Sequence, residues 1–388
     1  MRPISVATVI ARLEGGAGVL ALRGARVMNG GAFEVTIVTG SESRLLGAAQ
    51  AAGLEVIVEP SLRAPIAPLN DLQALWRLEA LFGRRNFAVV HTHCAKAGVI
   101  GRSAARRTGV PRIVHTFHGF PFHEFQSMAR RQAYVSIERR IGRFTDVALC
   151  VGTGVAAEAV RRQLIAPERI RTIGVVVDGP EVVAASMSAR TPEARDRARR
   201  ALGLPVDATV VGAVGRLAYQ KAPEDFLAAM KELGRPDVIG IWVGGGELAD
   251  RVRRQAEALS GVRFVLAGER TDVLEVLPAF DVFVLSSRYE GLPTAVVEAM
   301  VCGVPVVATA VNAVSDLVVP GETGLLVPPH RPDELAASVR FLLDSPVAAA
   351  RMASTARARL GDRYSALALH DVVTAAYAPV AEAGVTPP

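Results

Sequence analysis

Two glutamates separated by a turn and the start of a helix are the first residues whose types and spacing suggest chemistry. Glu290 follows the apolar run 281–285 in a loop, and Pro293 and Thr294 can open a helix with Glu298 in its second turn. The helix N-terminus offers free N–H groups to an anion, and a rise of ~1.5 Å per residue sets the carboxylates about 10 Å apart. One carboxylate can then bind the hydroxyls of a ribose, and the backbone amides can bind phosphates. The other carboxylate can bind the hydroxyls of a sugar. Alone, two such glutamates more often form an acidic loop and a solvated helix face.

Cations after another apolar run favour the ligand-binding interpretation. Arg216 and Lys221 lie between the run 208–214 and a helical pattern, where positive charge can close on a diphosphate. Lysine is otherwise found only at Lys96 and Lys231, in a sequence rich in arginine. Together with the glutamates, these residues predict a site for a nucleotide diphosphate sugar. No metal is expected there, because the two cations supply the positive charge.

Five of the seven histidines lie between residues 91 and 123. His91 and His93 project from one face of a strand end, since strand side chains repeat every second residue, and a second run holds His115, His118 and His123. Each histidine alone equally suits a satisfied polar group at the end of a sheet. A His-x-His pair is also a common zinc spacing, but no carboxylate or cysteine completes a ligand set. A metal-dependent hydrolase built on this cluster is kept as an alternative.

A glycine-rich segment follows the first apolar run. Residues 16–21 match the dinucleotide fingerprint G-x-G-x-x-A, but the next run ends at Gly40 without the acidic residue that would hold an adenine ribose. A nicotinamide oxidoreductase is therefore disfavoured. We expect Gly15 and Gly16 instead to let the backbone come close to an anionic ligand.

Apolar runs alternate with amphipathic stretches along nearly the whole chain. Such runs, apolar throughout and separated by helices, predict parallel sheets that are covered on both faces. The expected strands are 4–10, 33–39, 54–58, 87–92, 112–116, 147–151, 170–177, 208–214, 238–243, 262–267, 281–285 and 305–309, and one expected helix is 223–233.

The segment 179–206 loses strand character and gains charge and proline, as an interdomain connection does. We predict an N-terminal Rossmann-like domain over 1–178, this linker with one helix, a C-terminal Rossmann-like domain over 207–365, and a final helix over 366–388 that returns to the N-terminal domain before a flexible tail. Two doubly wound α/β domains bind ligands outside the carboxyl ends of their strands, so they are expected to face a central cleft.

The motifs Gly215-Arg-Leu with Lys221, Val243-Gly-Gly-Gly-Glu-Leu, Glu290-Gly-Leu-Pro with Glu298, and Gly303-Val-Pro-Val-Val-Ala-Thr stand in an order that resembles family 4 of the glycosyltransferases. The resemblance spans the second half and extends weakly to the loops near Gly15 and His118. It implies the GT-B fold and retaining transfer of a hexose-type sugar from a UDP- or GDP-sugar, without a cofactor.

The resemblance also implies roles for individual residues. His118 and Glu290 act near the transferred sugar, with Arg216 and Lys221 on the diphosphate and Glu298 on the ribose. The other donor contacts fall on Gly15, Gly16, Gly244, Glu269, Arg270, Gly291, Leu292, Pro293 and Thr294, and the acceptor contacts on His91, His93, Lys96 and His123. Two positions depart from the family pattern, and neither is expected to do chemistry: Ala222 replaces a glycine, and 312–316 replaces a Gly-Gly-x-x-Glu segment.

The acceptor is not identified by these residues; an unknown sugar, a lipid-linked acceptor and a natural product all remain open, in surface polysaccharide or natural-product biosynthesis. A net charge of +6 without a basic stripe interleaved with aromatics does not favour nucleic acid. The arginine-rich segment 124–144 is typical of an ordinary surface helix, or of peripheral contact with an anionic membrane. Three separated cysteines and no signal peptide suit the cytoplasm. A nucleotide-sugar epimerase on the same fold is the nearest alternative enzyme.

Overall fold

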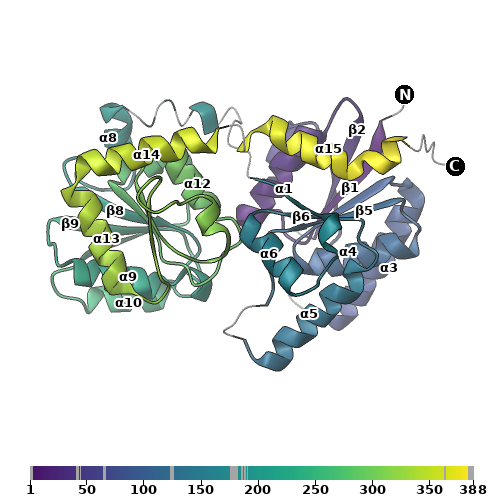
Figure 1. The fold of residues 1–388 in the computed structure, drawn as a ribbon, viewed down its shortest axis with the longest axis horizontal. Coiled ribbons are helices and arrows are strands. Elements are labelled where there is room, and N and C mark those ends of the chain that lie inside the picture. The colour runs from purple at the N-terminus through teal and green to yellow at the C-terminus, as the bar shows by residue number, and fades with distance from the viewer. Residues whose placement is uncertain are drawn as a thin grey trace. The chain divides into compact units, whose positions relative to one another are not determined.

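The computed structural model describes residues 3–40, 43, 45–63, 67–122, 126–174, 182–184, 187, 189, 191–361 and 364–382. The chain divides into a first unit, Met1–Val176 with Ser365–Pro388, and a second unit, Val177–Tyr364. Each unit has its own parallel sheet with helices around it (Figure 1).

The sheet of the first unit has the order β3-β2-β1-β4-β5-β6-β7, and all neighbouring strands run parallel. Its strands are β1 (Ile4–Ile10), β2 (Phe33–Thr39), β3 (Glu55–Val58), β4 (Val89–His93), β5 (Arg112–Phe117), β6 (Val147–Cys150) and β7 (Ile170–Thr172). The central strands are rich in valine and isoleucine and are buried, as expected of a sheet covered on both faces.

Two apolar clusters hold helices on the two faces of this sheet. The helices are α1 (Gly15–Met28), α2 (Leu45–Ala51), α3 (Pro68–Arg85), α4 (Ala95–Arg107), α5 (Met128–Gly142), α6 (Thr153–Arg161) and α15 (Ala366–Glu382), with a 3-10 turn η1 (Pro167–Arg169). Val6 and Ile10 belong to the cluster that includes α1 and α15, whereas Ala7 and Val9 belong to the cluster that includes α3 and α4. This alternation follows from the two-residue period of a strand.

The second unit repeats this arrangement with the order β10-β9-β8-β11-β12-β13. Its strands are β8 (Thr209–Val214), β9 (Val238–Val243), β10 (Arg263–Gly268), β11 (Val282–Leu285), β12 (Val306–Thr309) and β13 (Leu325–Val327). Its helices are α8 (Pro192–Ala201), α9 (Pro223–Leu233), α10 (Ala249–Glu257), α11 (Val273–Val276), α12 (Thr294–Val301), α13 (Pro332–Asp344) and α14 (Pro346–Leu360), with 3-10 turns η2 (Tyr219–Lys221), η3 (Leu277–Ala279) and η4 (Asn312–Asp316).

The expected strands all form, and their ends differ by one or two residues except in β7. The strand β7 ends at Thr172, because Ile173 and Gly174 lie outside it, and residues 175–177 of the expected strand lie outside the described residues. The three-residue strand β13 was not predicted from the sequence. The helix α8, expected within the interdomain segment, packs against η3 and α11 of the second unit. No helix in the described part of the chain is long and apolar enough to cross a bilayer.

In both sheets the direction of strand addition reverses once, between β1 and β4 and between β8 and β11. At such a switch point the loops that follow the two central strands diverge, and ligands of doubly wound folds bind in the crevice between them. The loops after β8 and β11 carry Lys221 and Glu290, and the segments after β1 and β4 carry Gly15 and Lys96.

Candidate functional site

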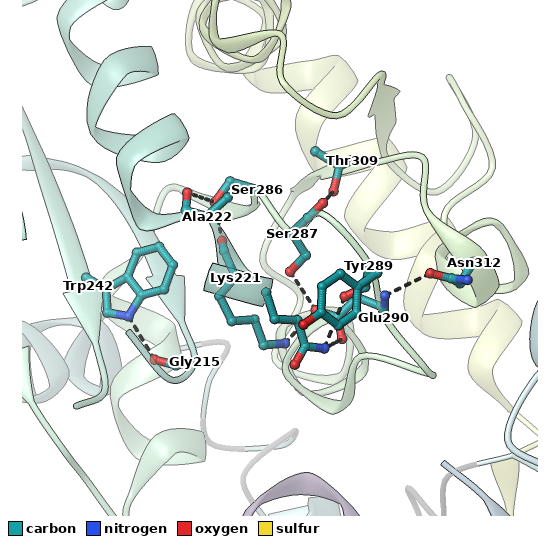
Figure 2. Close-up of polar contacts among 11 residues, drawn as sticks. Gly215, Lys221, Ala222, Trp242, Ser286, Ser287, Tyr289, Glu290, Thr309 and Asn312 are labelled. Atoms are coloured by element: carbon teal, nitrogen blue, oxygen red, sulfur yellow. Dashed lines mark hydrogen bonds and ion pairs between the residues drawn. The ribbon is translucent and has the colours of Figure 1, made fainter. Parts of the chain in front are cut away.

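Lys221 and Glu290 form an ion pair across the switch point of the second unit (Figure 2). Lys221 Nζ lies 2.5 Å from Glu290 Oε1, and the two side chains are 18% and 5% exposed. The lysine ends the turn η2 after β8, and the glutamate lies in the loop between β11 and α12. From the sequence the two residues were expected to bind different parts of a ligand; in the structure they are in contact with each other.

The Glu290 carboxylate is held by further polar groups that the sequence analysis did not single out. Ser287 Oγ donates to Glu290 Oε1 at 2.5 Å, and Gln220 Nε2 donates to Oε2 at 3.4 Å. The backbone N–H of Glu290 donates to Asn312 Oδ1 at 2.9 Å (Figure 2). A carboxylate with this many partners is fixed in orientation before any ligand arrives.

The backbone around Lys221 is tied to the neighbouring strand end. Ser286 Oγ shares its hydrogen bond between the carbonyl oxygens of Lys221 and Ala222, which lie at 2.9 and 3.0 Å. Ala222 has φ 48°, in the left-handed region that favours glycine. Ala222, which replaces the glycine of the family pattern, therefore keeps the backbone conformation typical of glycine and adds a methyl group. This geometry turns the chain from η2 into α9.

A glycine loop after β9 supports the loop that carries Arg216. Gly244 has φ 140°, and a Cβ there would lie 2.1 Å from the carbonyl oxygen of Gly215, so no side chain fits. Trp242 Nε1 donates to the same oxygen at 2.8 Å. Arg216 is exposed. Burial raises the pKa of Tyr289, and the positive charge of Arg216 partly opposes this rise, so the two side chains lie within electrostatic range of each other. Gly244 thus has a structural role whether or not it contacts a ligand.

The remaining donor residues lie around the start of α12 and after β10. Gly291, Leu292, Pro293 and Thr294 lead into α12. Its N-cap residue, Pro293, makes no side-chain cap, and Glu298 lies partly buried in the second turn. Backbone N–H groups at such an end suit an anion. Glu269 is exposed, whereas Arg270 binds Asp272 with bonds of 2.8 and 2.5 Å.

In the first unit a hydrogen-bonded group of histidines lines a cavity of about 30 Å³ under α1 and α15. His93 Nδ1 and His118 Nε2 share a hydrogen bond of 2.9 Å, in which one ring donates and the other accepts. His91 bonds to Tyr377 Oη and to Thr116 Oγ1, each at 2.7 Å. A cavity of this size admits water or a small polar group.

The histidines are neutral at pH 7 because they are buried. Burial lowers the pKa of His91 to about 3, with a smaller contribution from His118, and lowers the pKa of His118 to about 4. His118 Nδ1 is a buried nitrogen without a hydrogen-bond partner among the described residues. His115 is fully buried and bonds Thr92 Oγ1 at 2.8 Å, so it is a satisfied core group on that side. His123 lies outside the described residues.

The alternative of a metal-dependent hydrolase finds no support in this cluster. Among the described residues, no three histidine, cysteine or acidic side chains converge as metal ligands would. Both ring nitrogens of His91 are already engaged by hydroxyls, and one nitrogen of His93 is engaged by His118.

The three remaining predicted positions of the first unit, Gly15, Gly16 and Lys96, lie at the N-termini of helices. Gly15 begins α1 with φ 63° and open space around it, and Gly16 is exposed beside it. Gly18 packs on Leu13, whose carbonyl carbon would lie 2.7 Å from an added Cβ. Lys96, expected at the acceptor, forms an ion pair with Asp71 of α3.

Several residues of these networks were not predicted from the sequence, among them Gln220, Ser286, Ser287, Asn312, Thr116 and Tyr377. Gln220 is the neighbour of Lys221, and Ser287 lies three residues before Glu290; both follow the ends of predicted strands. Asn312 follows β12, the strand next to that of Glu290, and was set aside as a departure from the family pattern. Tyr377 is more than 250 positions from His91 and carried no local signal.

Two family models match the chain. The model described as "Glycosyl transferases group 1" matches residues 194–359, and the model described as "Glycosyltransferase Family 4" matches residues 14–178. The first covers the group around Lys221 and Glu290, and the second covers the histidine cluster apart from Tyr377.

Curated and solved proteins resemble the chain over most of its length. The UDP-Gal:alpha-D-GlcNAc-diphosphoundecaprenol alpha-1,3-galactosyltransferase of Escherichia coli is 32% identical over 274 residues, 69% of each chain. The D-inositol 3-phosphate glycosyltransferase 2 of Catenulispora acidiphila is 31% identical over 318 residues, 76% of this chain and 72% of that protein. The Anabaena protein HepE, solved with UDP and glucose, superposes with a TM-score of 0.82 at 19% identity, covering 97% of this chain and all of HepE, a similarity of fold.

Proposed function

Because this chain belongs to the family 4 glycosyltransferases and has their GT-B fold of two Rossmann-like domains, we propose that it transfers a hexose-type sugar from a UDP- or GDP-sugar with retention at the anomeric carbon. The observation that carries the proposal is the Lys221–Glu290 pair at the switch point of the second unit, beside the uncapped N-terminus of α12. The site joins a cation, a fixed carboxylate and free amides, which together suit a phosphorylated sugar.

In the proposed reaction, the bond between the anomeric carbon and the diphosphate breaks and negative charge builds on the diphosphate. Lys221, the exposed Arg216 and the amides of α12 stabilise that charge, and such preorganised stabilisation is often the largest catalytic contribution. Glu290 binds hydroxyls of the transferred sugar, and Glu298 binds those of the ribose. Glu269 and Arg270 lie beside the base, and no metal ion is required.

We further propose that the first unit binds the acceptor. His118, neutral at pH 7, contacts the transferred sugar as a hydrogen-bonding group, and its orientation is fixed by His93. The name of the Escherichia coli relative specifies a UDP-linked donor and a diphosphoundecaprenol-linked acceptor. A lipid-linked acceptor is therefore the form that we propose for this chain, in the assembly of a bacterial surface polysaccharide.

Nucleotide binding in the presence of EDTA tests the donor site. We expect UDP or GDP to stabilise the protein without added metal, by ~2.7 kcal/mol at 100 times its Kd. Binding that disappears on chelation and returns with Mg²⁺ or Mn²⁺ would contradict the metal-free site. If neither UDP nor GDP stabilises the protein under any condition, the donor assignment itself is contradicted.

Incubation with a UDP-sugar alone, followed by NMR, separates transfer from epimerisation. A transferase leaves the sugar configuration of the donor unchanged, whereas the epimerase alternative produces a new sugar nucleotide without an acceptor. NMR of the anomeric proton of a transferred sugar then reports retention or inversion.

A further inference from the structure

The turn η2, which carries Lys221, is short and makes few hydrogen bonds of its own. It is a 3-10 turn of three residues, and the backbone N–H groups of Lys221 and Ala222 close it with bonds of 3.0 and 3.4 Å. Short 3-10 turns have poor hydrogen-bond geometry. Ala222, at its end, has φ 48°, a conformation that is unfavourable for alanine and persists only where neighbouring groups impose it. The position of Lys221 therefore depends on contacts from outside the turn.

The loop after β11 binds all three carbonyl groups of this turn. Arg288 Nη1 donates to the carbonyl oxygen of Tyr219 at 2.6 Å, and the backbone N–H of Arg288 donates to that of Gln220 at 2.8 Å. Ser286 Oγ lies 2.9 Å from the carbonyl oxygen of Lys221 (Figure 2). Arg288 thus makes two of the three contacts, and its side-chain contact is the stronger kind, because the donor is charged.

The Arg288 guanidinium is engaged by groups of the protein on its face and at both terminal nitrogens. Its carbon Cζ lies 4.3 Å from the centroid of the Tyr219 ring, and the Arg288 side chain is only 10% exposed. Nη1 lies 3.9 Å from Glu224 Oε2, and Nη2 lies 3.5 Å from Asp225 Oδ1, both in the first turn of α9. A guanidinium held in this way orients the backbone beside it and does not need a ligand to complete its contacts.

We propose that Arg288 is a positioning residue for the Lys221–Glu290 pair. It precedes Glu290 by two residues in the same loop and binds the carbonyl group two residues before Lys221, so one side chain fixes the spacing of the two loops that the pair joins. A wider spacing moves the Lys221 ammonium from its place beside the carboxylate. Charge that develops during a reaction is stabilised best by groups already in place, so a small displacement lowers the rate. This effect on turnover rests on the proposed function; the placement of Lys221 does not.

The chain has only three lysines, so the reactivity of the Lys221 amine can be measured directly. In the wild type this amine is 18% exposed and paired with Glu290. Labelling with a trace of acetic anhydride, followed by peptide mass spectrometry, should modify Lys221 about 10-fold faster in Arg288→Met, as the loss of a charged hydrogen bond implies. Lys96 and Lys231 should keep their wild-type rates. An unchanged rate at Lys221, or an equal increase at all three lysines, overturns the proposal.

Three further variants make the labelling experiment specific. Arg288→Lys should raise the Lys221 rate less than Arg288→Met does, because an ammonium can still donate to the Tyr219 carbonyl but cannot stack as a planar group. Tyr219→Leu removes the stacked ring at a position that is 44% exposed, so it spares the core, and it should raise the rate about 3-fold. A rate in Tyr219→Leu equal to that of the wild type contradicts the role of the stacked guanidinium.

Arg340→Met is the matched control. Arg340 Nη2 donates to the carbonyl oxygens of Glu232 and Leu233 at 3.1 and 3.0 Å, so it binds backbone at the opposite end of α9 from Arg288. This variant removes the same kind of contact and should leave the labelling of Lys221 at the wild-type rate. An increase as large as that in Arg288→Met would show that Lys221 responds to any loosening of α9, and would overturn the proposal.

Kinetics with a donor that the wild type turns over test the consequence for the reaction. Arg288→Met should lower kcat about 10-fold and change the donor KM little, and in a Lys221→Ala background it should lower kcat by less than about 2-fold, because the arginine acts through the lysine. Equal losses in both backgrounds would show that Arg288 does not act through Lys221, and would overturn the proposal.

Nucleotide protection separates a failure of this proposal from a failure of the donor assignment. UDP or GDP should slow the labelling of Lys221 in the wild type, since the proposed function sets the diphosphate against this amine. If neither nucleotide does so, the donor assignment fails, whereas the comparison of Arg288→Met with the wild type and Arg340→Met, made without nucleotide, still decides whether Arg288 positions Lys221.

Discussion

Lys221 Nζ and Glu290 Oε1 lie 2.5 Å apart, and their contact joins the loop after β8 to the loop after β11 (Figure 2). Both side chains are largely buried, and removal of one member of such a pair leaves a buried charge without its partner. The two residues therefore act as one unit, and the effects of changing them are not expected to add. A phosphorylated ligand that draws Lys221 to its oxygens would release the Glu290 carboxylate for sugar hydroxyls.

The variant Lys221→Ala should lower kcat on the order of 100-fold and change the donor KM little. Negative charge on the diphosphate grows as the glycosidic bond breaks, so the ammonium interacts more strongly with the transition state than with the bound donor. Lys221→Arg should recover only part of the rate, because a planar guanidinium does not fit the place of a compact ammonium. Steady-state kinetics decide: an unchanged kcat with a raised KM would make Lys221 a binding residue only.

The variant Asn312→Gly should reduce kcat up to about 10-fold and leave UDP binding intact. Asn312 has φ 44°, so glycine adds no backbone strain and removes only the oxygen that accepts from the Glu290 N–H. A net hydrogen bond contributes about 1 kcal/mol. Asn29→Gly removes the same kind of bond, to the Val35 N–H in the first unit, and is the matched control. An equal loss of rate in both variants would mean that Asn312 has no special link to the site.

Glu298→Ala should weaken UDP or GDP binding roughly 10–150-fold, the equivalent of losing a charged hydrogen bond. Glu290→Ala should leave the binding of the free nucleotide nearly intact, because a nucleotide without a sugar offers nothing to that carboxylate. Calorimetry on both variants tests this division. Equal losses of affinity would show that the two glutamates do not divide the ribose and the sugar between them.

The fold was predictable because its strands are local patterns. Continuous apolar runs such as Val238–Val243 need no partner to be recognised as buried parallel strands. The three-residue β13 was missed because its apolar run is too short to differ from a loop. The sequence predicted two doubly wound sheets without a strand order. The Lys221–Glu290 contact could have been inferred from the rule that ligands of such sheets bind where the loops after two central strands diverge.

The residues that orient the site were not predictable for a different reason. Asn312 acts through its side chain on the backbone of a loop 22 residues away, and Tyr377 reaches His91 across 286 residues. Neither position shows a local period or a motif, and the type of residue alone does not indicate its partner. The left-handed backbone conformation of Ala222 could not be predicted either, because alanine rarely adopts that conformation.

Tyr377→Phe should lower the free energy of unfolding by about 1–3 kcal/mol, because it leaves the buried Nδ1 of His91 without a partner while keeping the ring. Tyr134→Phe is the matched control: among the described residues its hydroxyl accepts only from the exposed Arg130, and the change should fall within about 0.5 kcal/mol. Urea denaturation of both variants measures the difference. Equal stability of Tyr377→Phe and the wild type would show that water replaces the lost hydroxyl.

Acid should destabilise the first unit through its buried histidines. Burial holds the pKa of His91 at about 3, against 6.5 in an unfolded chain, so between these values only the unfolded state takes up the proton. The stabilisation is therefore complete above pH 6.5 and is lost as the pH falls, by about 2 kcal/mol at pH 5 for His91 alone. Urea denaturation followed by circular dichroism at pH 7 and pH 5 gives the loss.

The variant His91→Gln should show a smaller loss of stability between pH 7 and pH 5 than the wild type, since glutamine does not titrate. His118→Gln, which removes a histidine with a pKa of about 4, should do the same and serves if the first variant does not fold. His330→Gln changes a half-exposed histidine of the second unit and should keep the wild-type loss. If the wild type, His91→Gln and His118→Gln all lose the same free energy of unfolding between pH 7 and pH 5, the histidines at this site are not held neutral. The role of His118 as an uncharged hydrogen-bonding group would then be contradicted as well.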